Sequence, residues 1–277
     1  MTVKHVLVHV EPGLGSEVRL KYAIAFAHAF DAKLIGVTVT LPPTEIPSAM
    51  MGEAQLFNAA LQSSEEASTF ASTQFAKMTS DCGLQTEWRN GEGNPTEVVA
   101  AEAGRADIAI VGGTDRDVLD GGVYNLSPAD VLMTCGRPVL VLPNAAVPTF
   151  PHKRVLVAWK NSPEAARAVH DAIPVLRLAD EVVLSEIVAN ETWNGRYTIS
   201  INDVADHLRA HGVPVKVRRI QGGSGDAGGL LLGLATEIAA DLFVAGGYGH
   251  SRLREWVLGG VTASVLEQAR IPYLLSH

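Results

Sequence analysis

Two groups of glycines in the C-terminal half of the chain stand where a phosphate chain could bind. Gly246 and Gly249 follow the apolar run Leu242–Ala245, and Gly259 and Gly260 stand further along the chain. Glycine lets the backbone approach a ligand because it has no Cβ, and the free N–H groups at a helix N-terminus attract phosphate. If a strand ends at the first group and a helix begins after the second, the two groups would surround the phosphates.

Neighbouring side chains could complete such a phosphate site. Ser251 or Thr262 would offer a hydroxyl group. A second apolar run ends at Ala158, Trp159 and Lys160, where the lysine could meet a phosphate and the indole could stack on a base or pack in the core. The predicted binding residues are Ala158, Trp159, Lys160, Gly246, Gly249, Ser251, Gly259, Gly260, Val261 and Thr262.

The elements that must position these residues occur twice along the chain. Three landmarks recur in the same order: 4–8 as 153–157, 107–113 as 241–247, and 138–142 as 272–276. The first offset is 149 residues and the other two are 134, so the first copy holds about fifteen extra residues. An ordered repeat of this length indicates a duplicated domain. Because 143–151 holds three prolines, we expect a linker there and domains at 1–145 and 152–277.

Each copy alternates short apolar runs with helical patterns. Strands are expected near 4–10, 33–39, 84–89, 107–112 and 138–142, and again near 153–159, 181–188, 213–220, 242–245 and 272–275. The extra residues of the first copy predict a long helix from about Gly52 to Ser80, and the last helix of the second copy is expected at 261–269. Helices between continuously apolar strands predict an α/β fold, with one five-stranded parallel sheet and four helices in each copy.

The spacing Gly-x2-Gly-x9-Gly at 246, 249 and 259, after a strand of a duplicated α/β unit, resembles the nucleotide loop of the universal stress protein family. The resemblance covers nearly the whole chain, as in tandem members of that family. It implies two adenine nucleotide alpha hydrolase-like domains, with ATP or a related nucleotide in the second and Mg²⁺ as a candidate companion ion. It also implies a role in stress response or regulation. The two domains of one chain would pack as a pair, and two chains could form a homodimer.

Each copy departs from the family pattern at a different place. In the second copy, Gly260 replaces the family's Ser or Thr, and Lys160 replaces the Asp that follows the first strand. In the first copy, Glu11 keeps an acid, but Asp115 and Asn125 replace the second and third glycines. Because further aspartates stand near Asp115 and would repel phosphate, we expect a nucleotide only in the second copy.

Composition argues against several other functions. The 22 Lys and Arg against 30 Asp and Glu give a net charge of −8 without a basic cluster, which disfavours nucleic acid and anionic membranes as partners. No apolar run reaches the about 18 residues of a membrane span, and the start of the chain lacks a signal segment. The two cysteines have no metal-binding spacing. We therefore expect a soluble, cytoplasmic protein without a bound structural metal.

Two alternatives to nucleotide binding stay open. The chain could be an interaction or regulatory protein that binds no nucleotide, with the glycines only shaping a turn. A slow ATPase would need a general base or a metal-binding carboxylate near the loop, and we predict no catalytic residue. Gly223-x-Gly225-x-x-Gly228 matches a dinucleotide fingerprint, but it follows the third strand of its unit and lacks the acidic residue that holds the ribose.

Some polar residues are expected only on helix surfaces. These are Ser63, Ser64 and Ser68 on the long helix, and His28, His170, His207 and His211 on other helices.

Overall fold

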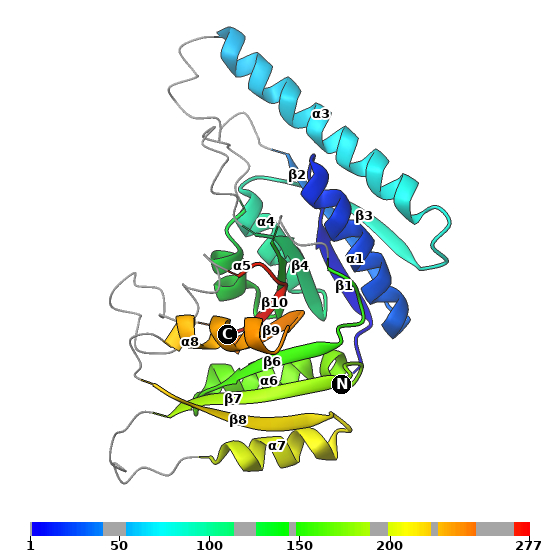
Figure 1. The fold of residues 1–277 in the computed structure, drawn as a ribbon. Coiled ribbons are helices and arrows are strands. Elements are labelled where there is room, and N and C mark those ends of the chain that lie inside the picture. Colours follow the sequence, from blue (N-terminus) through cyan, green and yellow to red (C-terminus); the bar gives the residue numbers. More distant parts are fainter. Residues whose placement is uncertain are drawn as a thin grey trace. The chain divides into compact units, whose positions relative to one another are not determined.

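The computed structural model describes residues 2–40, 54–113, 126–143, 148–188, 199–222, 227–247 and 269–277 (Figure 1). Internal contacts divide the chain into a first unit, Val3–Val147, and a second unit from Pro148 to His277. Each unit is an α/β domain with five parallel strands.

The first unit follows the predicted alternation of strands and helices. Its elements are β1 (His5–His9), α1 (Leu14–Phe30), β2 (Lys33–Thr40), α3 (Ala54–Thr79), β3 (Thr86–Glu92), α4 (Pro95–Ala103), β4 (Ile108–Gly112), α5 (Pro128–Cys135) and β5 (Val139–Leu142). The strands lie in the order β3-β2-β1-β4-β5, and Leu7 of β1 lies opposite Ile35 of β2 and Ala109 of β4. Helices α1 and α3 contact each other, as do α4 and α5, so the two pairs cover opposite faces of the sheet (Figure 1).

The second unit repeats this topology. Its elements are β6 (Arg154–Trp159), α6 (Pro163–Leu176), β7 (Glu181–Val188), α7 (Ile201–Ala210), β8 (Val215–Gln221), α8 (Ala227–Glu237), β9 (Leu242–Gly246) and β10 (Tyr273–Ser276). The strands lie in the order β10-β9-β6-β7-β8, all parallel. The predicted α/β fold and all the predicted strands are confirmed, with ends that agree to within three residues. The predicted long helix is α3, whereas the helix expected at 261–269 falls mainly outside the described residues.

One aspartate fixes the first strand in each unit. Asp107 Oδ2 accepts hydrogen bonds from the backbone N–H groups of Lys4 (2.7 Å) and His5 (2.9 Å). Asp241 accepts the equivalent pair of bonds at the start of β6, at 2.7 and 3.0 Å. The two aspartates stand 134 residues apart, so the duplication preserves this anchor as well as the apolar runs.

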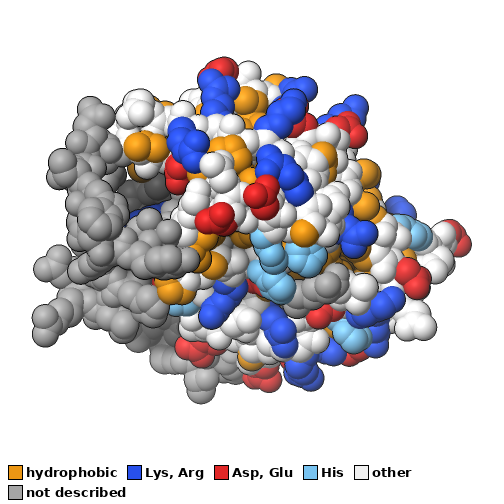
Figure 2. Space-filling view, turned by 90° about the horizontal axis from the view of Figure 1, so that it is seen from below, with side chains coloured by type: hydrophobic (Ala, Val, Ile, Leu, Met, Phe, Trp, Pro, Cys, Tyr) orange, Lys and Arg blue, Asp and Glu red, His pale blue; other side chains and the backbone are white. Residues whose placement is uncertain are grey.

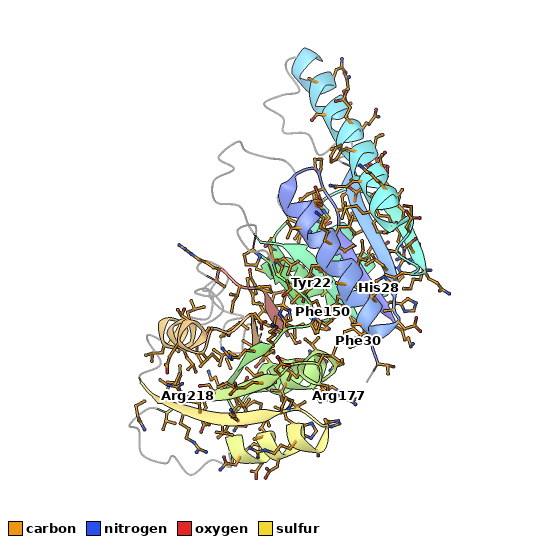
Figure 3. The ribbon with its side chains drawn as sticks, turned by 45° about the vertical axis from the view of Figure 1, so that its right-hand side comes forward. Tyr22, His28, Phe30, Phe150, Arg177 and Arg218 are labelled. Atoms are coloured by element: carbon orange, nitrogen blue, oxygen red, sulfur yellow. The ribbon has the colours of Figure 1, made fainter. Side chains whose placement is uncertain are left out.

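Aromatic and aliphatic side chains form the core between sheet and helices. On α1, the ring centroid of Phe26 lies 6.2 Å from that of Tyr22 and 5.0 Å from that of Phe30. Figure 3 labels Tyr22 and Phe30 on this helix. His28 of the same helix is exposed, as predicted, and the other three helix-surface histidines are exposed too. Within the described residues, no helix has the length and hydropathy that crossing a membrane requires.

Ion pairs cover the outer strand of the second unit. On β8, Lys216 lies 2.8 Å from Glu181, and Arg218, labelled in Figure 3, lies 2.7 Å from Glu237. On the face drawn in Figure 2, basic and acidic side chains are interspersed. Exposed pairs of this kind each contribute about 0–1 kcal/mol to stability.

Candidate functional site

The order of strands in the second unit reverses between β6 and β9. These two strands pair directly, with Val155 opposite Leu242 and Val157 opposite Val244. Open α/β sheets bind ligands at this kind of reversal, just beyond the carboxyl ends of the strands. Lys160 is the first residue after β6 and Gly247 the first after β9, so both lie at this edge.

The turn after β6 presents Lys160 to solvent. The Ser162 N–H donates to the Lys160 carbonyl at 2.7 Å, and Ser162 Oγ then caps α6 by accepting from Ala165 N–H at 3.3 Å. Pro163 occupies the first turn of α6, where its missing N–H costs nothing. Lys160 is exposed, and no carboxylate of the described residues forms an ion pair with it. Its ammonium group is therefore available to an anion.

Gly246 lies against the first turn of α6. A Cβ at this position would stand 2.5 Å from the backbone nitrogen of Ala165 and 2.6 Å from the carbonyl carbon of Glu164. Such distances are too short for any side chain, so close helix packing by itself requires glycine here. Contact between Gly246 and a phosphate stays a prediction.

The other predicted binding residues divide into buried and undescribed ones. Trp159 is 6% exposed and packs in the core, and Ala158 is half-buried. Stacking of Trp159 on a base therefore stays a prediction. The remaining predicted residues, Gly249, Ser251, Gly259, Gly260, Val261 and Thr262, lie outside the described residues, as do Asp115 and Asn125 of the first copy.

An arginine fills the corresponding strand reversal of the first unit. The Arg19 side chain is 1% exposed, and its Nε donates to the His9 carbonyl at 2.8 Å. Its Nη2 donates to Glu11 Oε1 at 2.7 Å. A Cβ on Gly112, at the end of β4, would collide with Arg19 Nη1. The guanidinium therefore lies between the ends of β1 and β4, where a ligand would enter in an open sheet.

The second unit has no arginine at the equivalent helix position. Helix α6 begins 149 residues after α1, the same offset that separates Lys160 from Glu11. Arg19 thus corresponds to Ala168, which is fully buried. The two strand reversals differ in chemistry: the first holds an internal ion pair, and the second presents an exposed lysine.

The first unit also contains a cavity of about 260 Å³ beyond the ends of β1 and β2. Glu11 and His9 line it from the β1 side, Thr38 and Val39 from β2, and Pro95 from the start of α4. Helix α3 covers it with Ser63 and Ala67.

The side chains of α3 explain why the space is open. Further along the helix, Phe75 packs on Trp88 with ring centroids 5.1 Å apart, and it fills the space above Gly36. At the turns before Phe75, the buried residues among those described on α3 are the small Ser64, Ser68 and Ala71. The prediction that Ser64 and Ser68 lie on the helix surface is wrong, because both are on the buried face of α3. Small side chains at these turns leave a gap that phenylalanine closes elsewhere.

Burial and neighbouring charges set the protonation of the cavity wall. Burial, opposed by the Glu11 charge and assisted by the Arg19 charge, lowers the pKa of His9 to about 4. The ring is therefore neutral at pH 7. Burial raises the pKa of the Glu11 carboxyl, but His9 and Arg19 lower it by more, so it ends below its ordinary value. Glu11 is therefore an anion at neutral pH.

Sequence reasoning missed Arg19, His9 and Thr38 as parts of this site. One signal was available for Arg19, because it shares a helix face with Ala23 and Phe26, both fully buried. A charge on an apolar helix face needs a buried partner. Among the described residues, no group of three or more His, Cys, Asp or Glu is arranged to hold a metal ion.

Comparisons with known proteins bear on the whole chain. The model of the universal stress protein family matches twice, at residues 2–143 and 151–277. The structure of a universal stress protein from Archaeoglobus fulgidus is 18% identical with a TM-score of 0.72, covering 100% of this chain and 99% of that one. A functionally unknown protein from Pseudomonas aeruginosa is 16% identical with a TM-score of 0.63, covering 99% and 92%. A family protein from Arabidopsis thaliana with AMP bound is 15% identical with a TM-score of 0.35, covering 50% and 91%. No curated protein matches the chain.

Proposed function

Because the chain belongs to the universal stress protein family, we propose that its second unit binds ATP or a related nucleotide in a regulatory or stress-response role. The observation that carries the proposal is the pairing of β6 with β9. This pairing brings Lys160 and the start of the glycine-rich segment to one edge of the sheet, at the strand reversal. In this proposal, Lys160 meets the phosphates and the glycines from Gly246 onward surround them.

The first unit is proposed not to bind a nucleotide. Arg19 occupies the strand reversal there, and its Nε and Nη2 already donate to His9 and Glu11. A phosphate entering this edge would meet the Glu11 carboxylate, which would repel it. The proposal therefore predicts one nucleotide per chain.

The test is a titration of Lys160 variants with ATP and GTP. A charge-assisted contact contributes about 1.5–3 kcal/mol, so Lys160→Ala should weaken ATP binding by about one to two orders of magnitude. Lys160→Asp restores the acid of the family pattern and should improve the discrimination of ATP from GTP. Lys153→Ala is the matched control, because Lys153 is also exposed but lies at the opposite end of β6.

Two results would count against this function. If Lys160→Ala binds ATP as tightly as the parent, Lys160 does not contact the nucleotide. If neither the parent nor Lys160→Asp binds any nucleotide, the chain acts instead as an interaction or regulatory protein that binds none.

A further inference from the structure

The cavity of the first unit has no part in nucleotide binding by the second, yet chemically active side chains line it. The Glu11 side chain is 39% exposed and borders the cavity together with the His9 ring. Thr38 and Ser63 supply hydroxyl groups, while Val39 and Ala67 supply apolar contact. A small volume with a few polar groups among apolar ones is typical of a small-molecule site.

The described groups that could attract an anion near this cavity already form hydrogen bonds within the protein. The Arg19 guanidinium donates to the His9 carbonyl and to Glu11 Oε1. The N-terminus of α4 is capped, because Asn94 Oδ1 accepts hydrogen bonds from Thr96 N–H (3.0 Å) and Glu97 N–H (3.3 Å). None of the described residues lining the cavity is a lysine or an arginine. Among the described residues, an anionic ligand would therefore meet the Glu11 carboxylate with no free cation beside it.

The same arrangement favours a hydrogen-bond donor that carries positive charge. Arg19 forms its ion pair with Glu11 through Oε1, while Glu11 Oε2 lies 3.8 Å from His9 Nδ1. The positive end of the Glu11–Arg19 pair is buried in the protein and the partly exposed carboxylate is its negative end. A cationic N–H group next to a carboxylate forms a charge-assisted hydrogen bond, which is about twice as strong as a neutral one.

The size of the cavity limits the ligand further. Its volume of about 260 Å³ lies just below the range of about 300–1,000 Å³ for ligand pockets. A compact ring or a short chain fits such a volume, whereas a nucleoside triphosphate does not.

We propose that the first unit binds a small organic cation, an amine or amidine, with its N–H groups on Glu11 and its carbon skeleton between Val39 of β2 and Ala67 of α3. This site is separate from the proposed nucleotide site and takes a ligand of opposite charge. One chain would then bind an organic cation in one unit and a nucleotide in the other.

Three probes of one size and shape test the charge requirement: benzamidine, benzamide and benzoate. Each is titrated into the full chain, and binding is followed by the NMR signals of the β1 and β2 amides. Benzamidine should shift these signals with a dissociation constant below those of the two other probes. Equal binding of benzamide would refute the need for positive charge, and tighter binding of benzoate would reverse the assignment. Absence of benzamidine binding would overturn the proposal.

Two pairs of variants locate the site. Glu11→Gln keeps the shape but removes the charge, and it should weaken benzamidine binding by about tenfold to a hundredfold. Glu17→Gln is its control, because Glu17 pairs with Lys21 on α1 and does not line the cavity. Ser63→Phe should block the cavity without disturbing Arg19, whereas Gln62→Phe, one residue away on α3, should not.

Benzamidine binding that survives both Glu11→Gln and Ser63→Phe would place the site elsewhere. Saturating ATP should leave the benzamidine affinity unchanged, since the two sites lie in different units. The two titrations therefore test the two sites separately: benzamidine binding can be absent while ATP binds, and ATP binding can be absent while benzamidine binds.

Discussion

Acidification should destabilise the first unit because His9 is buried as a neutral ring. Burial lowers its pKa to about 4 from 6.5. The folded state then binds fewer protons than the unfolded state between these values. The contribution of the neutral His9 ring to the free energy of unfolding is fully present above about pH 6.5 and is lost as the pH falls toward about 4. A difference of about 2.5 units corresponds to about 3 kcal/mol in full, of which about 2 kcal/mol is lost by pH 5.

The assay is urea unfolding at pH 7 and pH 5, followed by the indole NMR signal of Trp88 in β3. His9→Gln removes the titrating ring and should lose about 2 kcal/mol less than the parent over this interval. His28→Gln is the control, since His28 is exposed on α1 of the same unit. If the parent and His9→Gln show the same dependence on pH, His9 is not held neutral, and the electrostatic description of the cavity is wrong.

Gly246→Ala should destabilise the second unit by about 1–3 kcal/mol, because a Cβ would stand 2.5 Å from the Ala165 backbone nitrogen. Gly233→Ala, inside α8, should instead stabilise it by about 0.5–1 kcal/mol, because the added Cβ would meet no described atom outside its own helix within 4 Å. Thermal unfolding compares the two, and equal effects would contradict the close packing at Gly246. Arg19→Met should destabilise the first unit by about 3 kcal/mol, the lower end of the range for breaking a buried pair, since Glu11 is partly exposed. Calorimetry measures that loss, and NMR should show the pKa of Glu11 rising; an unchanged pKa would mean that Arg19 does not hold this carboxylate.

The fold follows from the sequence because its signals are local and occur twice. Continuous apolar runs such as Leu242–Ala245 predict buried parallel strands. A second copy with the same elements in the same order supports each of them independently. The long helix α3 was predicted nearly to its ends, although which of its faces is buried was not.

The site was harder to predict because it depends on contacts between distant segments. Arg19 lies against Gly112 only after β1 and β4 pair, and the sequence around Arg19 carries no sign of that distant contact. Ser64 and Ser68 are polar, and polar residues are mostly exposed, so composition favoured the wrong face of α3. Their burial follows from the position of Phe75 further along the same helix.

The most direct test of the proposed function is calorimetric titration of the full chain with ATP. We expect one nucleotide per chain, because Arg19 and Glu11 exclude phosphate from the first unit while Lys160 is available to bind it in the second. Gly249→Asp, which copies the aspartate of the first copy into the second, should abolish binding through added bulk and repulsion. Two equivalent sites, or full binding by Gly249→Asp, would contradict the assignment of the nucleotide to the second unit.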